Sequence, residues 1–588
     1  MRRNPPWAMV ALLLLTAGLA AANTEENLRA HVGYLADDAR QGRGIGTPGL
    51  REAADYIAAE FRSMGLKPAF EGSFFQPFEM GWGVALGPAN HVKLGEARFD
   101  TSKGIMPLGF SSAATARGAV VFAGYGITAP EYEYDDFAEV QAEGKIVLCM
   151  TGEPGEFDTT SVFEGVSYTT HVTLRAKVSN AKLHGATALL VVEGPIYAGT
   201  AAEVLKPPRS DEPYMDCGIP AMRVTRATVS ALFPEFDLES VQRFIDANTA
   251  PRSLELKSDT VEVAVDISRE TVEVRNVAGI IPGDSDVIVI GAHYDHLGLG
   301  QSGSLDEKPG EVHNGADDNA SGVASILEAA RILKAEPIAA SVLVVAFTAE
   351  EVGLGGSRQI VDHFPLSLDH VRIMMNLDMV GRVRENKLTV IGCKTAEEFP
   401  SLVDSAAAKT GLEVTCKGDG YGPSDHMNFY LVDKPVLFLF TGAHEDYHRS
   451  SDDADKINYA DMTRVANFTA DLTRAVDAHE QPLTFVKVSE PAQKGGRFRS
   501  SFGSIPDFSQ PDSLLGMRLS GVREGGPAAQ AGLTRGDLLR RLGKVTINNI
   551  YDLTYALQIY APGDTVIVEF VREDELHSTT AILQPSTR

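Results

Sequence analysis

Cysteine is scarce in this chain. Only four cysteines occur among 588 residues, with no CxxC pair: Cys149, Cys217, Cys393 and Cys416. Cysteines this few and this widely spaced argue against a disulfide framework. Cys149 and Cys393 lie in apolar, strand-like runs, so we expect buried free thiols. The alternative is that one incidental disulfide forms in an oxidising compartment.

Basic residues are outnumbered as well. Lys and Arg total 53 against 79 Asp and Glu, which gives a net charge of -26. Such a charge repels phosphate backbones and anionic lipid surfaces, so we do not expect a nucleic-acid partner. Beyond the N-terminus no apolar run reaches the roughly 20 residues needed to span a bilayer. We therefore expect no transmembrane segment in the mature chain.

The N-terminus has the pattern of a secretory signal. Two arginines precede an apolar run from about Ala8 to Leu19, and the small residues Ala20, Ala21 and Ala22 follow it. This order of charged, apolar and small residues is typical of a signal peptide. We expect a signal peptide over residues 1–22 and an exported protein, either periplasmic or secreted.

The residue pattern changes along the chain, which indicates several domains. Residues 25–100 and 271–483 alternate apolar strands with helical patterns, which predicts a mixed α/β sheet with helices on both faces. Residues 101–270 between them are rich in short β-like runs and suggest an inserted domain. Residues 484–505 are rich in Gly, Pro and Ser and are predicted to be a linker. Residues 506–588 then run strand, short helix, strand, longer helix and strand.

Two adjacent glutamates, Glu350 and Glu351, follow an apolar strand in VLVVAFTAEEVGLGGS. Neighbouring carboxylates at a strand end can divide two tasks between them, metal ligand and general base, which suggests metal-assisted hydrolysis. The pair alone is weak, because Glu-Glu is common at solvated helix starts. The interpretation therefore depends on further candidates elsewhere.

Further candidate ligands follow other predicted strands or loops. They are His293 and Asp295 in GAHYDH, Asp318 in GADDNASG, Asp378 in NLDMVGR and His448 in YHRSSDD. Each has a simpler explanation when taken alone; Asp318, for example, could cap a helix. In an open α/β sheet, however, the carboxyl ends of the strands share one edge. Five such residues at that edge therefore indicate one site.

The residue types favour divalent metal. Asp318, Glu351 and Asp378 with one bridging hydroxide supply four negative charges, which balance two divalent cations. Neutral His293 and His448 complete the set, and nitrogen and oxygen ligands without thiolate suit zinc, with manganese or cobalt as alternatives. Asp295 is two residues from His293, and we expect its carboxylate to accept the imidazole's other proton.

Together these motifs resemble the co-catalytic zinc aminopeptidases of the M28 peptidase family. The resemblance implies a phosphorylase/hydrolase-like fold and the removal of N-terminal residues from peptides. It assigns one zinc ion to His293 and Asp378, the other to Glu351 and His448, and the bridge to Asp318. It also implies that Glu350 is the general base for a metal-bridging hydroxide, and that the peptide bond after Asp318 is cis.

Two further resemblances concern the other domains. GKIVLCM and AKLHGATALLVVEG in the insert resemble a protease-associated (PA) domain. GGPAAQAGL, RGDLL and DLTYAL in the tail resemble a PDZ domain. Such a domain binds an extended peptide or protein terminus, which implies that amides near Leu515, Gly516 and Met517 receive a carboxylate.

The loop CKGDGYGPSDHMNFY is expected to border the substrate pocket. Tyr421 is a candidate donor to the substrate carbonyl, with a packed loop aromatic as an equal alternative, and His426 is interpreted as structural. Some relatives staple this loop with two nearby cysteines, whereas here Cys416 has no neighbouring cysteine before Ser424.

Two other functions stay open. A carboxypeptidase or dipeptidase of the same superfamily would need a basic cluster for the substrate carboxylate. No such cluster is evident in the Tyr421 loop, although Arg382 and Arg449 are near the ligands in sequence. A non-catalytic, peptide-binding receptor with a peptidase fold is the other alternative, and the intact set of candidate ligands argues against it.

Overall fold

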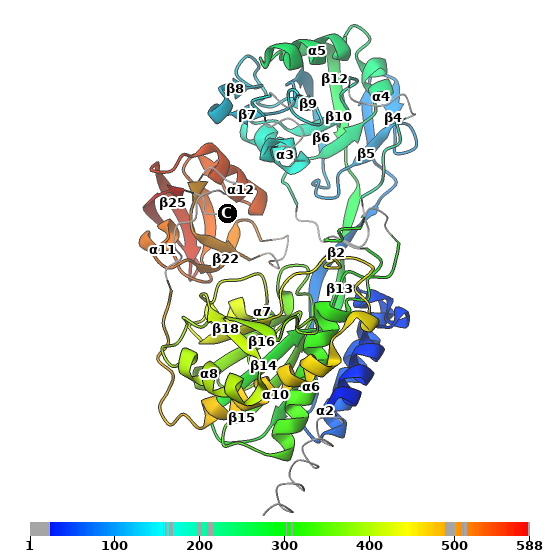
Figure 1. The fold of residues 1–588 in the computed structure, drawn as a ribbon. Coiled ribbons are helices and arrows are strands. Elements are labelled where there is room, and N and C mark those ends of the chain that lie inside the picture. Colours follow the sequence, from blue (N-terminus) through cyan, green and yellow to red (C-terminus); the bar gives the residue numbers. More distant parts are fainter. Residues whose placement is uncertain are drawn as a thin grey trace, which may run out of the picture. The chain divides into compact units, whose positions relative to one another are not determined.

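The computed structural model describes residues 24–156, 158, 161–163, 169–196, 203–208, 216–300, 303–306, 310–488, 500–507, 510 and 514–585. The predicted signal peptide lies outside these residues. The chain forms two compact units, Met1–Met80 with Val272–Glu490, and Gly81–Thr271 with Pro491–Arg588 (Figure 1). Within the described ranges, no helix has both the length and the apolar character needed to cross a membrane.

The first unit is built on a nine-stranded sheet with the order β1-β13-β15-β14-β16-β19-β17-β18, in which β2 also pairs with β13. These strands are β1 (Lys67–Pro68), β2 (Phe75–Leu86), β13 (Ile267–Ile281), β14 (Val287–His293), β15 (Ser341–Phe347), β16 (Val371–Leu377), β17 (Lys387–Ile391), β18 (Glu413–Lys417) and β19 (Val436–Phe440). The four central strands, β15, β14, β16 and β19, are parallel neighbours. Strands β13 and β17 run antiparallel to their central neighbours.

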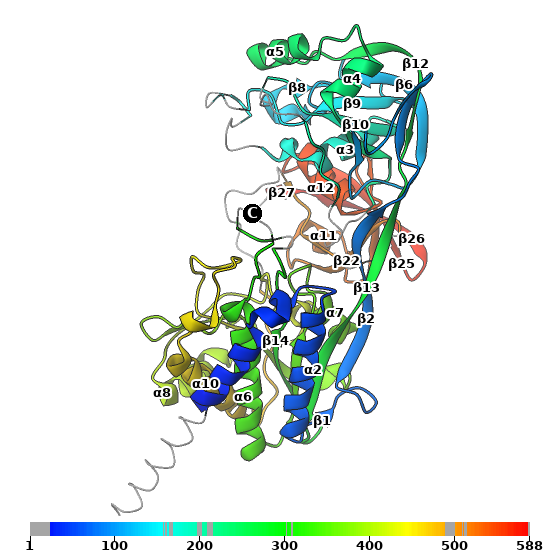
Figure 2. The ribbon, with the colours of Figure 1, turned by 90° about the vertical axis from the view of Figure 1, so that its right-hand side faces the viewer.

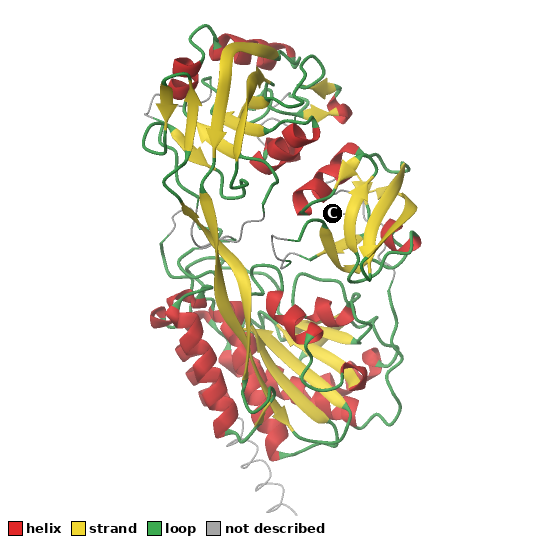
Figure 3. Cartoon of the chain, turned by 180° about the vertical axis from the view of Figure 1, so that it is seen from behind, coloured by secondary structure: helices red, strands yellow, loops and turns green. Residues whose placement is uncertain are grey.

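Helices cover this sheet. They are α2 (Pro48–Ser63), α6 (Gly322–Ala335), α7 (Gly355–Asp362), α8 (Phe399–Thr410), α9 (His426–Tyr430) and α10 (Tyr459–Asp477). Helix α6 packs against α10 and against the three strands β14, β15 and β16 (Figure 2). Every residue of β14 and β15 is buried, which requires cover on both faces of the sheet (Figure 3). The predicted mixed α/β architecture is therefore confirmed.

The inserted region forms an eight-stranded sheet with the order β4-β3-β12-β6-β9-β10-β11-β5. Its elements are β3 (His91–Leu94), β4 (Ala97–Phe99), β5 (Ile105–Pro107), β6 (Thr115–Phe122), β9 (Ile146–Met150), α3 (Leu174–Leu183), β10 (Ala188–Val192), β11 (Ala221–Val224), α4 (Arg226–Leu232), α5 (Leu238–Asn248) and β12 (Leu254–Ala264), beside the small pair β7 (Thr128–Ala129) and β8 (Tyr134–Asp135). This sheet begins before the expected domain boundary at residue 101, because β3 and β4 already pair within it. Composition changes near Gly104, but strand pairing begins earlier.

The tail forms a six-stranded sheet with the order β21-β22-β23-β25-β26, and β24 pairs with β23. Its elements are β20 (Ser500–Ser501), β21 (Ser504–Pro506), β22 (Met517–Val522), α11 (Pro527–Gln530), β23 (Leu538–Leu542), β24 (Val545–Thr546), α12 (Ile550–Ile559), β25 (Thr565–Arg572), β26 (Glu575–Ile582) and β27 (Gln584–Pro585). The predicted succession of strand, short helix, strand, longer helix and strand is present. Strands β20 and β21 begin inside the stretch expected to be a linker, so the folded tail starts earlier than predicted.

Insert and tail belong to the same compact unit and share polar contacts. Lys182 in α3 forms an ion pair with Asp552 in α12, with 2.9 Å between Nζ and Oδ2. The Asn549 side chain donates a hydrogen bond to the main-chain oxygen of Asp216 at 2.7 Å. Leu183 packs against the hydrophobic core of the tail. The sequence did not indicate this association.

The cysteines require one correction. Cys149 and Cys217 are free and buried, as expected for Cys149, but Cys393 and Cys416 form a disulfide with 5.6 Å between their Cα atoms. Parallel strands β17 and β18 are neighbours, and the chain between them contains α8. This crossover brings together two cysteines that are 23 residues apart. The partner of Cys416 is therefore Cys393, on the preceding side of α8, and not a cysteine in the loop that follows Cys416.

Candidate metal centre

The candidate ligands gather at the carboxyl edge of the four parallel strands. His293 is the last residue of β14, Asp378 directly follows β16, and the Glu350-Glu351 pair lies just beyond β15. Asp318 lies in the turn before α6, and His448 lies in the loop after β19. Because these strands are adjacent and parallel, their ends bring five distant segments together, as the sequence predicted.

Two groups of donor atoms share Asp318. His293 Nε2 lies 3.3 Å from Asp318 Oδ1 and 3.3 Å from Asp378 Oδ1. His448 Nε2 lies 3.4 Å from Asp318 Oδ2 and 3.3 Å from Glu351 Oε2. Each oxygen of Asp318 therefore faces a different histidine, which is the arrangement expected of a carboxylate that bridges two ions.

The spacing of these atoms fits metal coordination. Bonds of about 2.0 to 2.1 Å to zinc in tetrahedral geometry place neighbouring donor atoms about 3.3 to 3.4 Å apart. All four separations given above agree with that distance. The residues present thus fit two divalent ions with nitrogen and oxygen ligands, and His293, Asp318 and Asp378 offer donor atoms that lie within 4.8 Å of one another.

The turn that carries Asp318 is held from two sides. Its η5 segment (Ala316–Ser321) contains a cis peptide bond between Asp318 and Asn319, as the family resemblance implied. One oxygen of Asp452 accepts hydrogen bonds from the main-chain N–H groups of Asp317 and Asp318, at 2.8 and 3.0 Å. The Asn319 side chain donates to the Leu377 carbonyl at 2.9 Å. These bonds fix the carboxylate of Asp318 relative to β16.

Asp378 is oriented by a serine that the sequence analysis did not assign. Ser424 Oγ donates to Asp378 Oδ2 at 2.7 Å, and the Asn376 side chain donates to Ser424 at 2.7 Å. One oxygen of Asp378 is thereby occupied, and the other faces His293. Ser424 lies in the SDH segment, two residues before His426.

The Asp295 carboxylate has a different hydrogen-bond partner from the one expected. The His293 Nδ1 atom lies 3.1 Å from the main-chain oxygen of Asp295 but 3.9 Å from its carboxylate, so the hydrogen bond goes to the carbonyl. The carboxylate instead accepts from the main-chain N–H of Glu350 at 3.2 Å. Asp295 thus orients both neighbours, the histidine through its backbone and the glutamate loop through its side chain.

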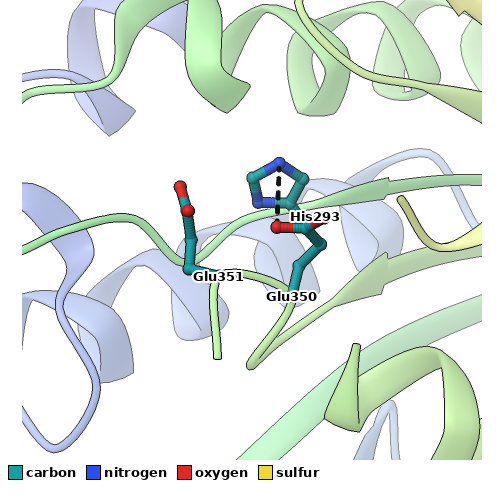
Figure 4. Close-up of side chains that lie close together, drawn as sticks. All are labelled: His293, Glu350 and Glu351. Carbon is teal, nitrogen blue, oxygen red and sulfur yellow. Dashed lines mark ion pairs between the residues drawn. The ribbon is translucent and has the colours of Figure 1, made fainter. Parts of the chain in front are cut away.

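Glu350 and Glu351 have different surroundings (Figure 4). The Glu350 carboxylate lies 4.0 Å from His293 Nε2, and burial raises its pKa well above the ordinary value against the lowering effect of that ring. Burial and Asp318 raise the pKa of Glu351, but the hydrogen bonds from His296 and His448 lower it to about 2 overall. Two adjacent carboxyl groups with opposed shifts suit different roles, one accepting a proton and one staying ionised.

Two basic residues near the site were missed. His296, the second histidine of GAHYDH, lies 2.7 Å from Glu351 through its Nδ1 atom. Arg43 is fully buried, and its guanidinium donates to the carbonyl oxygens of Leu35, Tyr294, Asn314 and Gly315. It therefore ties the N-terminal segment to the loop after β14 and to the loop that precedes Asp318. The GRG sequence around Arg43 gave no sign of burial, because arginine is seldom fully buried.

Tyr421 and His426, the loop residues considered from the sequence, make their main contacts with other side chains. Tyr421 is buried and meets Tyr430 edge-on, with 4.9 Å between ring centroids. His426 stacks on Phe438 at 4.7 Å, and burial lowers its pKa to about 3, which keeps the ring neutral. These contacts are those of packed aromatic and structural side chains.

The arginines considered for a carboxypeptidase are already paired. Arg382 contacts Asp446 at 3.1 Å and Asp452 at 2.8 Å, and Arg449 contacts Asp306 at 3.3 Å. A cavity of about 410 Å³ beside Arg382 is lined by Arg382, Arg384, His444, Glu445 and Asp446. Its two acidic residues offset the charge of its arginines.

The tail residues proposed to bind a carboxylate are partly engaged in the fold. The Gly516 N–H donates to the Asn548 carbonyl at 2.9 Å. Met517 is fully buried and pairs with Leu539 of β23, whereas Leu515 is 57% exposed. The Gly516 amide is thus already in use.

Comparisons with known proteins give two family matches and a set of similar proteins. Residues 276–473 match the model of peptidase family M28, and residues 114–232 match that of the PA domain. The chain is 26% identical to aminopeptidase YwaD of Bacillus subtilis over 62% of this chain and 70% of that protein. It is 29% identical to leucine aminopeptidase 1 of Uncinocarpus reesii over 34% of this chain and 53% of that protein. An aminopeptidase structure from Aneurinibacillus sp. strain AM-1 is 22% identical and covers 79% of this chain and 96% of its own, with a TM-score of 0.47.

The fold and the donor cluster define a metal-dependent hydrolase. Residues 276–473 match the M28 peptidase family, residues 114–232 match a PA domain, and the chain is a metallopeptidase. The expected resemblances to the M28 family and to a PA domain are thereby confirmed.

Proposed function

We propose that this protein is an aminopeptidase with two zinc ions, which removes N-terminal residues from peptides. The observation that carries the proposal is the shared carboxylate of Asp318, whose two oxygens lie 3.3 and 3.4 Å from His293 and His448. His293 and Asp378 would hold one ion, and Glu351 and His448 the other. When bound, the ions supply Lewis-acid polarisation of the scissile carbonyl and lower the pKa of the attacking water.

Glu350 supplies the proton transfer. Its side chain is 10% exposed and its carboxylate lies 4.0 Å from His293 Nε2, which places it beside the ions as a base. We assign it to accept the proton of the attacking water and then to deliver it to the leaving amine. The Asp295 carboxylate supports this role because it holds the main-chain N–H of Glu350.

The charge around the site supports a free N-terminus as the substrate's recognition feature. Buried carboxylates surround His293, and the nearby guanidinium of Arg382 is already neutralised by two aspartates. Because Arg382 is already paired, it offers no free positive charge to a C-terminal carboxylate, which favours a substrate recognised by its free α-amine. The relatives named aminopeptidases agree with this choice.

A pair of blocked dipeptides tests the proposal. The protein should hydrolyse a C-amidated dipeptide with a free α-amine and leave an N-acetylated dipeptide with a free carboxylate intact. Activity should disappear with a zinc chelator and return on adding zinc. Preference for the N-acetylated substrate would instead support a carboxypeptidase, and absence of both zinc and hydrolysis would support a peptide-binding receptor.

The remaining domains extend the proposal. The strand and helix order of residues 506–588 supports a PDZ-like module that binds a peptide or protein terminus, and the N-terminal pattern supports export to the periplasm or the medium. The PA domain is proposed to affect substrate access. Manganese or cobalt could replace zinc in a site of nitrogen and oxygen donors.

A further inference from the structure

His296 is a buried histidine beside the metal centre that the assignment of ligands leaves without a role. It follows Asp295 after β14, and its side chain is fully shielded from solvent. Its Nδ1 atom lies 2.7 Å from Oε1 of Glu351, whereas His448 Nε2 lies 3.3 Å from the other oxygen, Oε2. The two histidines therefore approach Glu351 from different oxygens and at different distances.

These distances distinguish a hydrogen bond between His296 and Glu351 from the binding of both side chains to one ion. A separation of 2.7 Å is that of a strong N–H···O bond to a carboxylate. It is too short for two donors on one zinc ion, which lie about 3.3 to 3.4 Å apart in tetrahedral geometry. The His296 Nδ1 atom is also 3.9 Å from Asp318 Oδ2, which is longer than that spacing. His296 thus has the position of a hydrogen-bond donor rather than that of a ligand.

The imidazole of His296 is held in place by its surroundings. Its main-chain N–H donates to the Arg43 carbonyl at 3.2 Å. Its ring lies directly on the backbone of Gly315, where an added Cβ would be 2.5 Å from the ring atom Cδ2. Among the described residues its Nε2 atom has no hydrogen-bond partner. Packing therefore sets the direction of the ring, and Glu351 receives its hydrogen bond.

We infer that His296 is a positioning residue, which holds Oε1 of Glu351 so that Oε2 alone faces the ion shared with His448 and Asp318. The inference rests on the proposed two-metal function. A donor to a ligating carboxylate fixes its orientation, and removal of such a partner typically lowers metal affinity by 10- to 100-fold. The loss should concern the ion on the Glu351 side, because His293 and Asp378 make no contact with His296.

Two substitutions test this role in the full-length protein. His296→Leu removes the donor, whereas His296→Asn places a side-chain amide N–H near the position of Nδ1. Zinc affinity is measured by competition with a chelator, and the coordination by the visible absorption of the cobalt-substituted protein. We expect His296→Leu to lower the affinity for one of the two ions by about 10- to 100-fold and to leave the affinity for the other unchanged. His296→Asn should stay close to the wild type in both measurements.

A double substitution decides between positioning and direct coordination. If His296 acts through Glu351, then His296→Leu adds no further loss of affinity in a Glu351→Ala background. A further loss there, or a His296→Asn variant as weak as His296→Leu, would overturn the inference. Thermal unfolding of the metal-free variants checks the fold, and if His296→Leu fails to fold, the His296→Asn result decides alone.

The failure of this inference can be told apart from the failure of the proposed function. Wild-type protein that takes up no zinc would contradict the two-metal proposal itself. Wild-type protein with two zinc ions, beside a His296→Leu variant that keeps both at unchanged affinity, would contradict only the role of His296.

Discussion

Glu350 and Glu351 are neighbours in the chain, yet only Glu351 contacts the histidines His296 and His448. Glu350→Gln should therefore keep both metal ions and lose turnover by roughly 10²- to 10⁴-fold, because the amide cannot accept the proton. Metal content and kcat of the purified variant check this prediction. Glu351→Gln is the matched control, since it should lose metal as well as activity. Unchanged kcat in Glu350→Gln would remove Glu350 from the role of base.

At the scale of residues, the sequence predicted which side chains meet at the sheet edge but not the contacts that support them. The side chains of His293, Asp318 and Asp378 each follow a strand or precede a helix, and the shared sheet edge makes their meeting predictable. The contacts of Ser424 and His296 depend on side-chain direction and on atoms only a few ångströms apart. Patterns of residue type carry no such detail, and for the same reason the carboxylate of Asp295 was expected on the wrong partner.

At the scale of elements, the disulfide between Cys393 and Cys416 links neighbouring strands β17 and β18 across the α8 crossover. Closing a loop of 23 residues should stabilise the folded state by about 3 kcal/mol, mainly by restricting the unfolded chain. The variant with serine at both positions should unfold at a correspondingly lower denaturant concentration than the oxidised wild type.

A reductant provides the control for this prediction. It should shift the unfolding midpoint of the wild type toward that of the double-serine variant and leave the variant itself unchanged. Equal midpoints for oxidised wild type and double-serine variant would show that the bridge contributes little to stability.

The strands themselves were predictable because β14, β15 and β16 are mostly apolar runs. Their order in the sheet and the boundary of the insert were not. Strands β3 and β4 look like a continuation of the first region in composition, but β3 pairs with β12 and β4 pairs with β3. Pairing between distant strands decides such boundaries, and local sequence does not record it.

At the scale of the whole chain, the sequence separated three regions but did not show that insert and tail form one compact unit. One part of this contact is the ion pair between Lys182, at the end of α3, and Asp552, which is 2% exposed. Ordinary surface sequences contain many such charges, so the pair could not be recognised before the structure.

Lys182→Met should loosen this contact, because it leaves the carboxylate of Asp552 buried without its cation. Breaking a buried pair costs roughly 3 kcal/mol at the lower end of the usual range, which suits a lysine that is 19% exposed. Hydrogen exchange should therefore accelerate in α3 and α12.

Two variants sharpen that measurement. Lys145→Met removes a partner of the well-exposed Glu255 in the same insert, and it should leave exchange in α12 unchanged, because surface pairs contribute about 1 kcal/mol or less. Adding Asp552→Asn to Lys182→Met removes the unpaired charge while an amide oxygen can still accept from the Asn548 N–H, which lies 2.9 Å from Asp552 Oδ2. Slower exchange in that double variant than in Lys182→Met would show that the stranded carboxylate opens the contact. Exchange at the wild-type rate in both variants would mean that the packing of Leu183 and the Asn549 bond hold the tail in place without the ion pair.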